Sequence, residues 1–159
     1  MSPEQRRLLV TQYATGPERL EAALATVPAA ALQWRPGPGR WSVHEILVHC
    51  ADSETNAHMR LRYLLAEPDP LILGYNQDHW AIELDYHAHP LPLALATIRA
   101  VRANTVPLLQ RLTEAQWQRT GRHTENPDFG VEPWLEAYGV HLDVHVRQIA
   151  RNMEAWGKQ

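Results

Sequence analysis

The sequence predicts an all-α protein in which residues 1–159 form a single domain, a four-helix bundle. Apolar residues recur every three or four positions along four long segments, which is the period of an amphipathic helix. Pro, Gly, Ser or Thr lie at the boundaries of these segments, and no stretch alternates apolar and polar residues as a half-buried strand does. Four helices with one apolar stripe each bury those stripes against one another, in an up-and-down or a crossover bundle.

The first helix is predicted over residues 2–27. Ser2 is a favourable cap, Pro3 is a favourable first helical residue, and Pro28 ends the segment. Gly16-Pro17 interrupts the segment in the middle, where proline cannot donate a backbone hydrogen bond. We therefore expect two parts that together form one kinked helix.

The second helix is predicted to start at Ser42, after a Pro- and Gly-rich loop over residues 34–40, and to stop before Pro68. Glu45 follows Ser42 at the spacing of a capping box, in which each side chain bonds the backbone N–H of the other residue. The apolar stripe of this helix consists of Val43, Ile46, Leu47, Cys50, Ala57, Leu61, Leu64 and Leu65. Residues 71–89 have no regular pattern, and we expect a loop there with one helical turn.

The third helix is predicted over residues 91–112, with a kink or a break at Pro107. A short helical turn over residues 113–117 and a polar, turn-rich stretch over residues 121–130 follow it. The last helix is predicted over residues 132–156 as one continuous element, because apolar residues keep helical spacing along its whole length.

Composition and charge narrow the classes of function. The formal charge is −3, the pI is near 6.3, and no block of Lys or Arg stands out. We expect neither a nucleic-acid nor a membrane partner, because either would need a basic face. Cys50 is the one cysteine, which excludes an internal disulfide and favours a reducing compartment. No signal-type apolar run or membrane-spanning segment is evident, so the sequence predicts a cytoplasmic protein.

Nine histidines are the unusual feature of the composition, and His141 and His145 lie four residues apart in the last predicted helix. That spacing places two imidazoles on one helical face, within reach of one metal ion. Each residue turns about 100° around a helix, so His49 lies on the corresponding side of the second helix. His44 and His58 lie about 140° and about 180° away from it. We therefore predict His49 as the third ligand; the alternative is a solvated or hydrogen-bonded histidine pair.

The spacing of the residues excludes other common metal sites. The zinc-protease motif H-E-x-x-H requires glutamate after the first histidine, where this chain has Leu142, and the pair His44 and His49 is one residue too far apart for it. A di-iron carboxylate site requires Glu-x-x-His on two helices, and neither predicted ligand helix has that motif. A single cysteine excludes cysteine-based zinc sites. What remains is an all-histidine site for one ion.

Two motifs resemble those of the DinB/YfiT-like family of metalloenzymes. Residues 41–52 match its early pattern W-S-x-x-E-x-x-x-H-x-x-D, residues 141–149 match its late pattern H-x-x-x-H-x-x-Q-I, and residues 112–117 resemble a turn between them. The resemblance covers essentially the whole chain. It implies an up-down-down-up four-helix bundle, often a homodimer, with one divalent metal ion (Zn, Ni, Fe or Mn) held by three histidines. Transferred by position, the implied ligands are His49, His141 and His145.

The predicted function is that of a divalent-metal-dependent enzyme acting on small molecules. Three neutral imidazoles leave the charge of the ion uncompensated and a coordination position open, so that a water or a low-molecular-weight thiol becomes a nucleophile near neutral pH. The resembling family includes thiol-dependent transferases, so we expect either a thiol S-transferase, with the thiol as co-substrate, or a hydrolase. The alternative is a stress-related bundle protein that binds metal without catalysis.

Two further residues are predicted to support the ligands. Asp52 lies one turn after His49 and is placed to orient that imidazole or a water on the metal, a role that the family pattern favours. The alternative for Asp52 is a solvated carboxylate or a bond to a basic side chain. Gln148 lies three residues after His145 and is expected to orient it.

Overall fold

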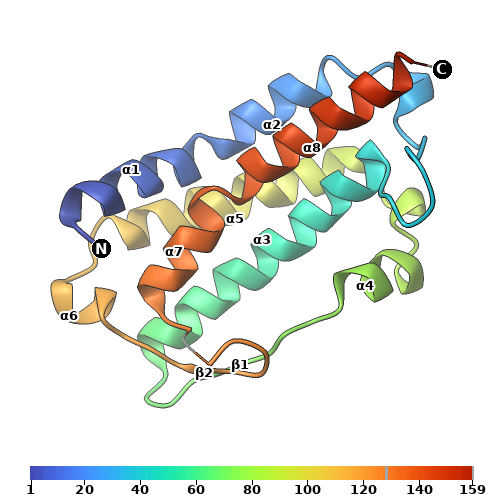
Figure 1. Ribbon diagram of the computed structural model, residues 1–159. Coiled ribbons are helices and arrows are strands. Elements are labelled where there is room, and N and C mark those ends of the chain that lie inside the picture. Colours follow the sequence, from blue (N-terminus) through green and yellow to red (C-terminus); the bar gives the residue numbers. More distant parts are fainter. Residues whose placement is uncertain (128, 159) are drawn as a thin grey trace.

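Four long helical segments run side by side along one axis and form the bundle that the sequence predicts (Figure 1). The structure is a computed structural model, and it describes residues 1–127 and 129–158. Two of the four segments are single helices, and the other two each consist of two consecutive helices. In chain order the bundle contains α1 (Pro3–Ala14), α2 (Gly16–Leu24), α3 (Val43–Ala66), α5 (Leu91–Leu109), α7 (Val131–Gly139) and α8 (His141–Trp156).

The bundle has up-down-down-up topology. α1 and α2 run in one direction, α3 and α5 both run in the opposite direction, and α7 and α8 return in the first (Figure 1). α3 packs along α5, while α2 packs along α8 and α1 along α7. Because α3 and α5 are parallel, the chain between them must cross back along the bundle, and it does so through β1 (Leu71–Ile72), α4 (Gln77–Glu83) and the 3-10 helix η2 (Tyr86–Ala88). The predicted topology is thereby confirmed.

The shorter elements depart from the sequence prediction in detail. β1 pairs in parallel with β2 (Arg122–His123), and two residues are too few to show the alternation by which a strand is recognised. The 3-10 helix η1 (Ala29–Ala31) and α6 (Glu114–Trp117) complete the connections. α5 continues past Pro107 and ends at Leu109, three residues before its predicted end. None of the described helices is long and apolar enough to cross a membrane.

The start of α3 is fixed by the predicted capping box. Ser42 Oγ accepts a hydrogen bond from the backbone N–H of Glu45 (3.2 Å), and the backbone N–H of Ser42 donates to Glu45 Oε2 (2.9 Å). Arg35, in the preceding loop, forms an ion pair with the same carboxylate. Because these contacts set the residue at which the helix begins, they also set which side chains of its first two turns face the interior, His49 among them.

The prediction of one continuous last helix is wrong, because the chain is divided at Val140. α7 ends at Gly139 and α8 begins at His141, and Val140 has φ −103° and ψ −4° between them. At the division Gly139 packs closely against α1, where an added Cβ would lie 3.0 Å from Leu9 Cδ2. Apolar periodicity does not reveal such a contact with a distant helix. The division places His141 in the first turn of α8.

Two apolar clusters fill the bundle, one on each side of a buried polar layer. On α3 the first cluster includes residues between Val43 and Ala51, and the second begins at Ala57. Glu54 lies between the two clusters with no exposed surface, and Arg102 of α5 is 1% exposed. An ion pair between these two side chains therefore lies in the interior, at the level where α7 meets α8.

Candidate metal centre

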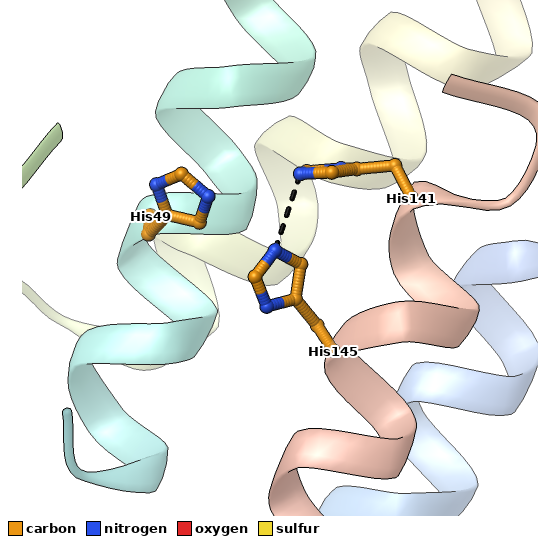
Figure 2. Close-up of side chains that lie close together, drawn as sticks. All are labelled: His49, His141 and His145. Atoms are coloured by element: carbon orange, nitrogen blue, oxygen red, sulfur yellow. Dashed lines mark hydrogen bonds between the residues drawn. The ribbon is translucent and has the colours of Figure 1, made fainter. Parts of the chain in front are cut away.

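The three predicted ligands converge between α3 and α8. His49 projects from the second turn of α3, and His141 and His145 project from the first two turns of α8 (Figure 2). One ring nitrogen of each lies within 4.8 Å of one ring nitrogen of the others. The ring centroid of His49 is 4.9 Å from that of His145 and 5.7 Å from that of His141. The helical-face argument from sequence thus selected the histidines that the fold brings together.

Hydrogen bonds orient the two histidines of α8. His141 Nδ1 lies 2.9 Å from Glu54 Oε1, and His145 Nδ1 lies 2.9 Å from Gln148 Oε1. A carboxylate and an amide oxygen can only accept, so each Nδ1 carries the hydrogen and donates it. Each Nε2 then presents its lone pair toward the cluster. This is the arrangement by which a metal-ligating histidine is usually held.

Two nitrogens of this cluster face each other at a distance that requires a cation between them. His141 Nε2 and His145 Nε2 lie 3.2 Å apart (Figure 2). Two lone pairs at that distance repel each other, so either a proton or a metal ion must lie between them. His49 is 3% exposed, and it turns the ring nitrogen farther from its Cβ toward the other two rings (Figure 2); its buried Nδ1, on the far side, has no hydrogen-bond partner among the described residues. A bound divalent ion would satisfy the facing nitrogens, and the residues present fit one.

Burial keeps the imidazoles of His49 and His145 neutral. Loss of hydration, followed by the effect of the neighbouring His145 and His141, lowers the pKa of His49 to about 2. Loss of hydration and His141 lower the pKa of His145 to about 4, against the opposing hydrogen bond to Gln148. Since a metal ligand must be deprotonated, both rings are ready to bind an ion at neutral pH without releasing a proton.

The donor set matches a catalytic rather than a structural metal site. Within residues 1–127 and 129–158, the group that could hold an ion consists of the three histidines, with no carboxylate or thiolate in it. A structural zinc site is closed by four protein ligands, whereas a catalytic site has three and leaves a position for water or substrate. Imidazole nitrogens suit Zn, Ni and Fe. A cavity of about 190 Å³ is lined by His145 of the cluster together with Trp41, Asp78 and Gln148.

Glu54 is the supporting residue that the sequence analysis missed. Its carboxylate receives the His141 hydrogen bond and two bonds from Arg102, from Nε (2.9 Å) and Nη2 (2.6 Å). Burial alone would raise the pKa of Glu54, but the charge of Arg102 and the bond from His141 outweigh it and lower that pKa. Arg102 also donates to the backbone oxygens of Tyr13 (2.5 Å) and Tyr138 (3.1 Å). The ion pair therefore connects His141 to the packing of α1, α3, α5 and α7.

A sequence signal for this ion pair does exist. Glu54 stands four residues after Cys50 and three before Ala57, in the centre of the apolar stripe of α3. Arg102 stands in the same way between Ile98 and Thr105 on α5. A charged residue is almost never fully buried without a partner, so opposite charges in the middle of two facing stripes indicate a buried pair.

The two supporting residues predicted from sequence differ in outcome. Gln148 contacts His145 as expected. Asp52 does not contact His49; its Oδ2 accepts a hydrogen bond from the Tyr86 hydroxyl (2.6 Å), which links α3 to η2. The expectation that Asp52 orients the imidazole is therefore wrong, because a residue 34 positions along the chain binds that carboxylate. Its other predicted role, toward a water at the metal, stays a prediction.

Glu54→Gln is expected to weaken the binding of Zn²⁺ by about 10–100-fold. The amide keeps the shape of the side chain but removes the charge that holds the His141 hydrogen on Nδ1. Competition with a chromophoric chelator measures the affinity. Glu45→Gln is the matched control, since Glu45 is also a buried glutamate of α3 and pairs with Arg35 rather than with a ligand. Equal affinities of the two variants would show that Glu54 does not orient His141.

Comparisons with known proteins identify sequences that this chain is similar to. A sequence profile described as the DinB superfamily matches residues 12–149. A protein of Halalkalibacterium halodurans named "Putative metal-dependent hydrolase" is 26% identical over 143 residues, which cover 90% of this chain and 83% of that protein. A protein of Oceanobacillus iheyensis with the same description is 31% identical over 111 residues, which cover 70% of this chain and 64% of that protein.

A solved structure has the same fold. YfiT from Bacillus subtilis superposes with a TM-score of 0.91 and 25% sequence identity, covering 99% of this chain and 90% of that one. It is described as "a probable metal-dependent hydrolase with an unusual four-helix bundle topology". The unusual order of the bundle helices, with its long crossover between α3 and α5, is thus shared with a protein that is described as metal-dependent.

Proposed function

The chain belongs to the DinB superfamily, and from this premise we propose that it is an enzyme that uses one divalent metal ion, held by His49, His141 and His145, to act on small molecules. The observation that carries the proposal is a cluster of three converging imidazoles, one of which lines an accessible cavity. Relatives named as metal-dependent hydrolases make hydrolysis the first candidate reaction. A cytoplasmic location and a homodimer remain predictions from sequence.

Some residues of the site would hold the metal ion, and others orient the histidines that hold it. A divalent ion, when bound, supplies Lewis acidity that lowers the pKa of a water or thiol ligand and makes it nucleophilic near neutral pH. Glu54 and Gln148 hold the donor nitrogens of His141 and His145 toward that position. Trp41, whose ring lies 4.7 Å from that of His49, covers one side of the site with an apolar surface. No additional protein nucleophile is required.

Thiol transfer is the second candidate, because a thiol is easier to deprotonate than water. Among the carboxylates near the ligands, Glu54 is bound to Arg102, and one oxygen of Asp52 accepts from Tyr86. Asp78 lines the cavity beside His145 and is the candidate base for an attacking water. A thiol loses its proton more readily than water and depends less on such a base. We therefore propose a water or a low-molecular-weight thiol as the nucleophile, with the thiol as co-substrate in the second case.

The test begins with metal-free protein that is reloaded with Zn²⁺, Ni²⁺, Fe²⁺ or Mn²⁺ in separate samples. Each sample is assayed for hydrolysis of a panel of small esters and amides, and by mass spectrometry for conjugates of an electrophile with bacillithiol, mycothiol or glutathione. We expect turnover that requires the metal and disappears in His145→Ala. Full metal occupancy without hydrolysis or conjugates in any sample would favour the alternative, a bundle that binds metal without catalysis.

A further inference from the structure

A second cavity, next to the metal centre, has the charge and shape of an anion-binding site. It measures about 430 Å³ and lies between the loop of residues 36–41 and the second half of α8. Figure 1 shows this loop beside the C-terminal part of α8. Arg40 of the loop and Arg151 of the helix are the charged residues that line it, with Gln148 and Asn152 as further polar groups.

The two guanidinium groups form no ion pair in the part of the chain that the structure describes, although Asp78 lines the smaller neighbouring cavity together with Arg40. Neither Arg40 nor Arg151 forms an ion pair with a described carboxylate, whereas Arg35, in the same loop, is paired with Glu45. No aspartate or glutamate lines the larger cavity. Two arginines that line one concave site can provide up to ten N–H donors in planar forks, a geometry that matches carboxylate and phosphoryl oxygens.

The walls of the cavity are held in place before any ligand arrives. Pro36 and Pro38 restrict the loop, and the backbone N–H of Arg40 donates to Gly37 O (3.1 Å) to close a turn. The turn passes through a positive φ of 67° that glycine at position 39 allows. Asn152 then ties the end of the loop to α8 by donating to the backbone oxygen of Trp41 (2.9 Å). A rigid site loses little conformational entropy on binding.

This cavity adjoins the opening to the metal centre. The cavity of about 190 Å³ beside His145 has Arg40, Trp41 and Gln148 in its lining, and so has the larger cavity. Gln148 bonds His145, and the Trp41 ring faces His49. A molecule with its anionic group between the arginines can therefore extend its uncharged end past Trp41 to the histidine cluster.

We propose that Arg40 and Arg151 form a subsite for the carboxylate or phosphoryl group of an anionic substrate or co-substrate. The role of this subsite in turnover depends on the proposed metal-dependent function, but anion binding itself does not. The arginines select molecules with an oxyanion at one end, and the reacting group lies at the other. Neutral or cationic analogues lack the group that the subsite holds.

The test titrates inorganic phosphate and, separately, malonate into metal-free and Zn²⁺-loaded protein, and follows the indole N–H signal of Trp41 by NMR. Trp41→Phe assigns that signal. We expect a saturable shift with at least one of the two anions in both forms of the protein. The double variant R40A/R151A is expected to bind at least about tenfold more weakly, because each charge-assisted hydrogen bond contributes strongly. Comparison of phosphate with malonate distinguishes a phosphoryl from a carboxylate ligand.

Two outcomes would overturn the subsite. The control R7A/R111A removes the same charge from exposed positions elsewhere; if it weakens binding as much as R40A/R151A, the effect is general electrostatics. Binding that persists in R40A/R151A and occurs only with Zn²⁺ present would place the anion on the metal. The metal-free samples measure anion binding at the arginines alone. This test therefore gives a result even if the proposed metal-dependent activity is not found.

Discussion

Replacing His145 by alanine is expected to remove the divalent ion almost completely, from about one per chain in the unaltered protein. The variant loses one of three nitrogen donors, so its affinity should fall by more than the about 10–100-fold expected for loss of a residue that merely supports a ligand. Elemental analysis after gel filtration measures the metal content. Wild-type protein should also gain thermal stability on adding Zn²⁺, since the ion binds the folded state, and the variant should gain none.

The matched control for this substitution is His79→Ala. His79 is an exposed histidine of α4 that pairs with Glu83 and lies outside the histidine cluster. It should retain the metal and the stabilisation by Zn²⁺. Circular dichroism of the metal-free proteins checks that both variants fold. Full metal occupancy in folded His145→Ala would refute the ligand assignment.

Arg102→Met is expected to cause the largest loss of stability, about 3–5 kcal/mol, because it leaves the carboxylate of Glu54 buried without its partner. Glu54 has no exposed surface, and methionine also removes the bonds to the backbone oxygens of Tyr13 and Tyr138. Urea unfolding of the metal-free protein measures the free energy of unfolding. Metal-free protein is used so that a change in metal affinity does not alter the measured free energy of unfolding.

The double variant E54L/R102M separates the lost ion pair from lost packing. Replacing both charges by apolar groups of similar volume removes the unpaired carboxylate, so this protein should be more stable than Arg102→Met alone. It should nevertheless bind Zn²⁺ more weakly than the unaltered protein, since His141 has lost its acceptor. A single variant that loses less than about 1 kcal/mol would show that the pair contributes little to the bundle.

The helices and the clustering of the three histidines were predictable from sequence because both depend on local spacing. The capping box of Ser42 and Glu45 fixes the register of α3, and within a regular helix the direction of His49 follows from about 100° per residue. The same arithmetic places His141 and His145 on one face, and the division at Val140 lies just outside the pair and leaves their spacing intact. The site could therefore be assembled from two short stretches of helix.

The sequence predictions that were wrong concern features that depend on contacts between distant segments of the chain. Asp52 has the right spacing to reach His49, but Tyr86 occupies its carboxylate, and no local pattern predicts where a residue of η2 packs. The division after Gly139, where α7 packs closely against Leu9 of α1, is likewise not marked by the apolar periodicity. Glu54 was partly predictable. Its position in the apolar stripe indicates that it has a buried partner, but it does not identify Arg102 as that partner.

X-ray absorption spectroscopy of the Zn²⁺-loaded protein tests the three-histidine centre most directly. The expected spectrum contains three imidazole nitrogens at about 2.0–2.1 Å and at least one further light atom that exchanges with added ligands. In His145→Ala the imidazole contribution should fall or the metal should be absent. A fourth imidazole in the unaltered protein, or sulfur at about 2.3 Å, would contradict an open site built from His49, His141 and His145.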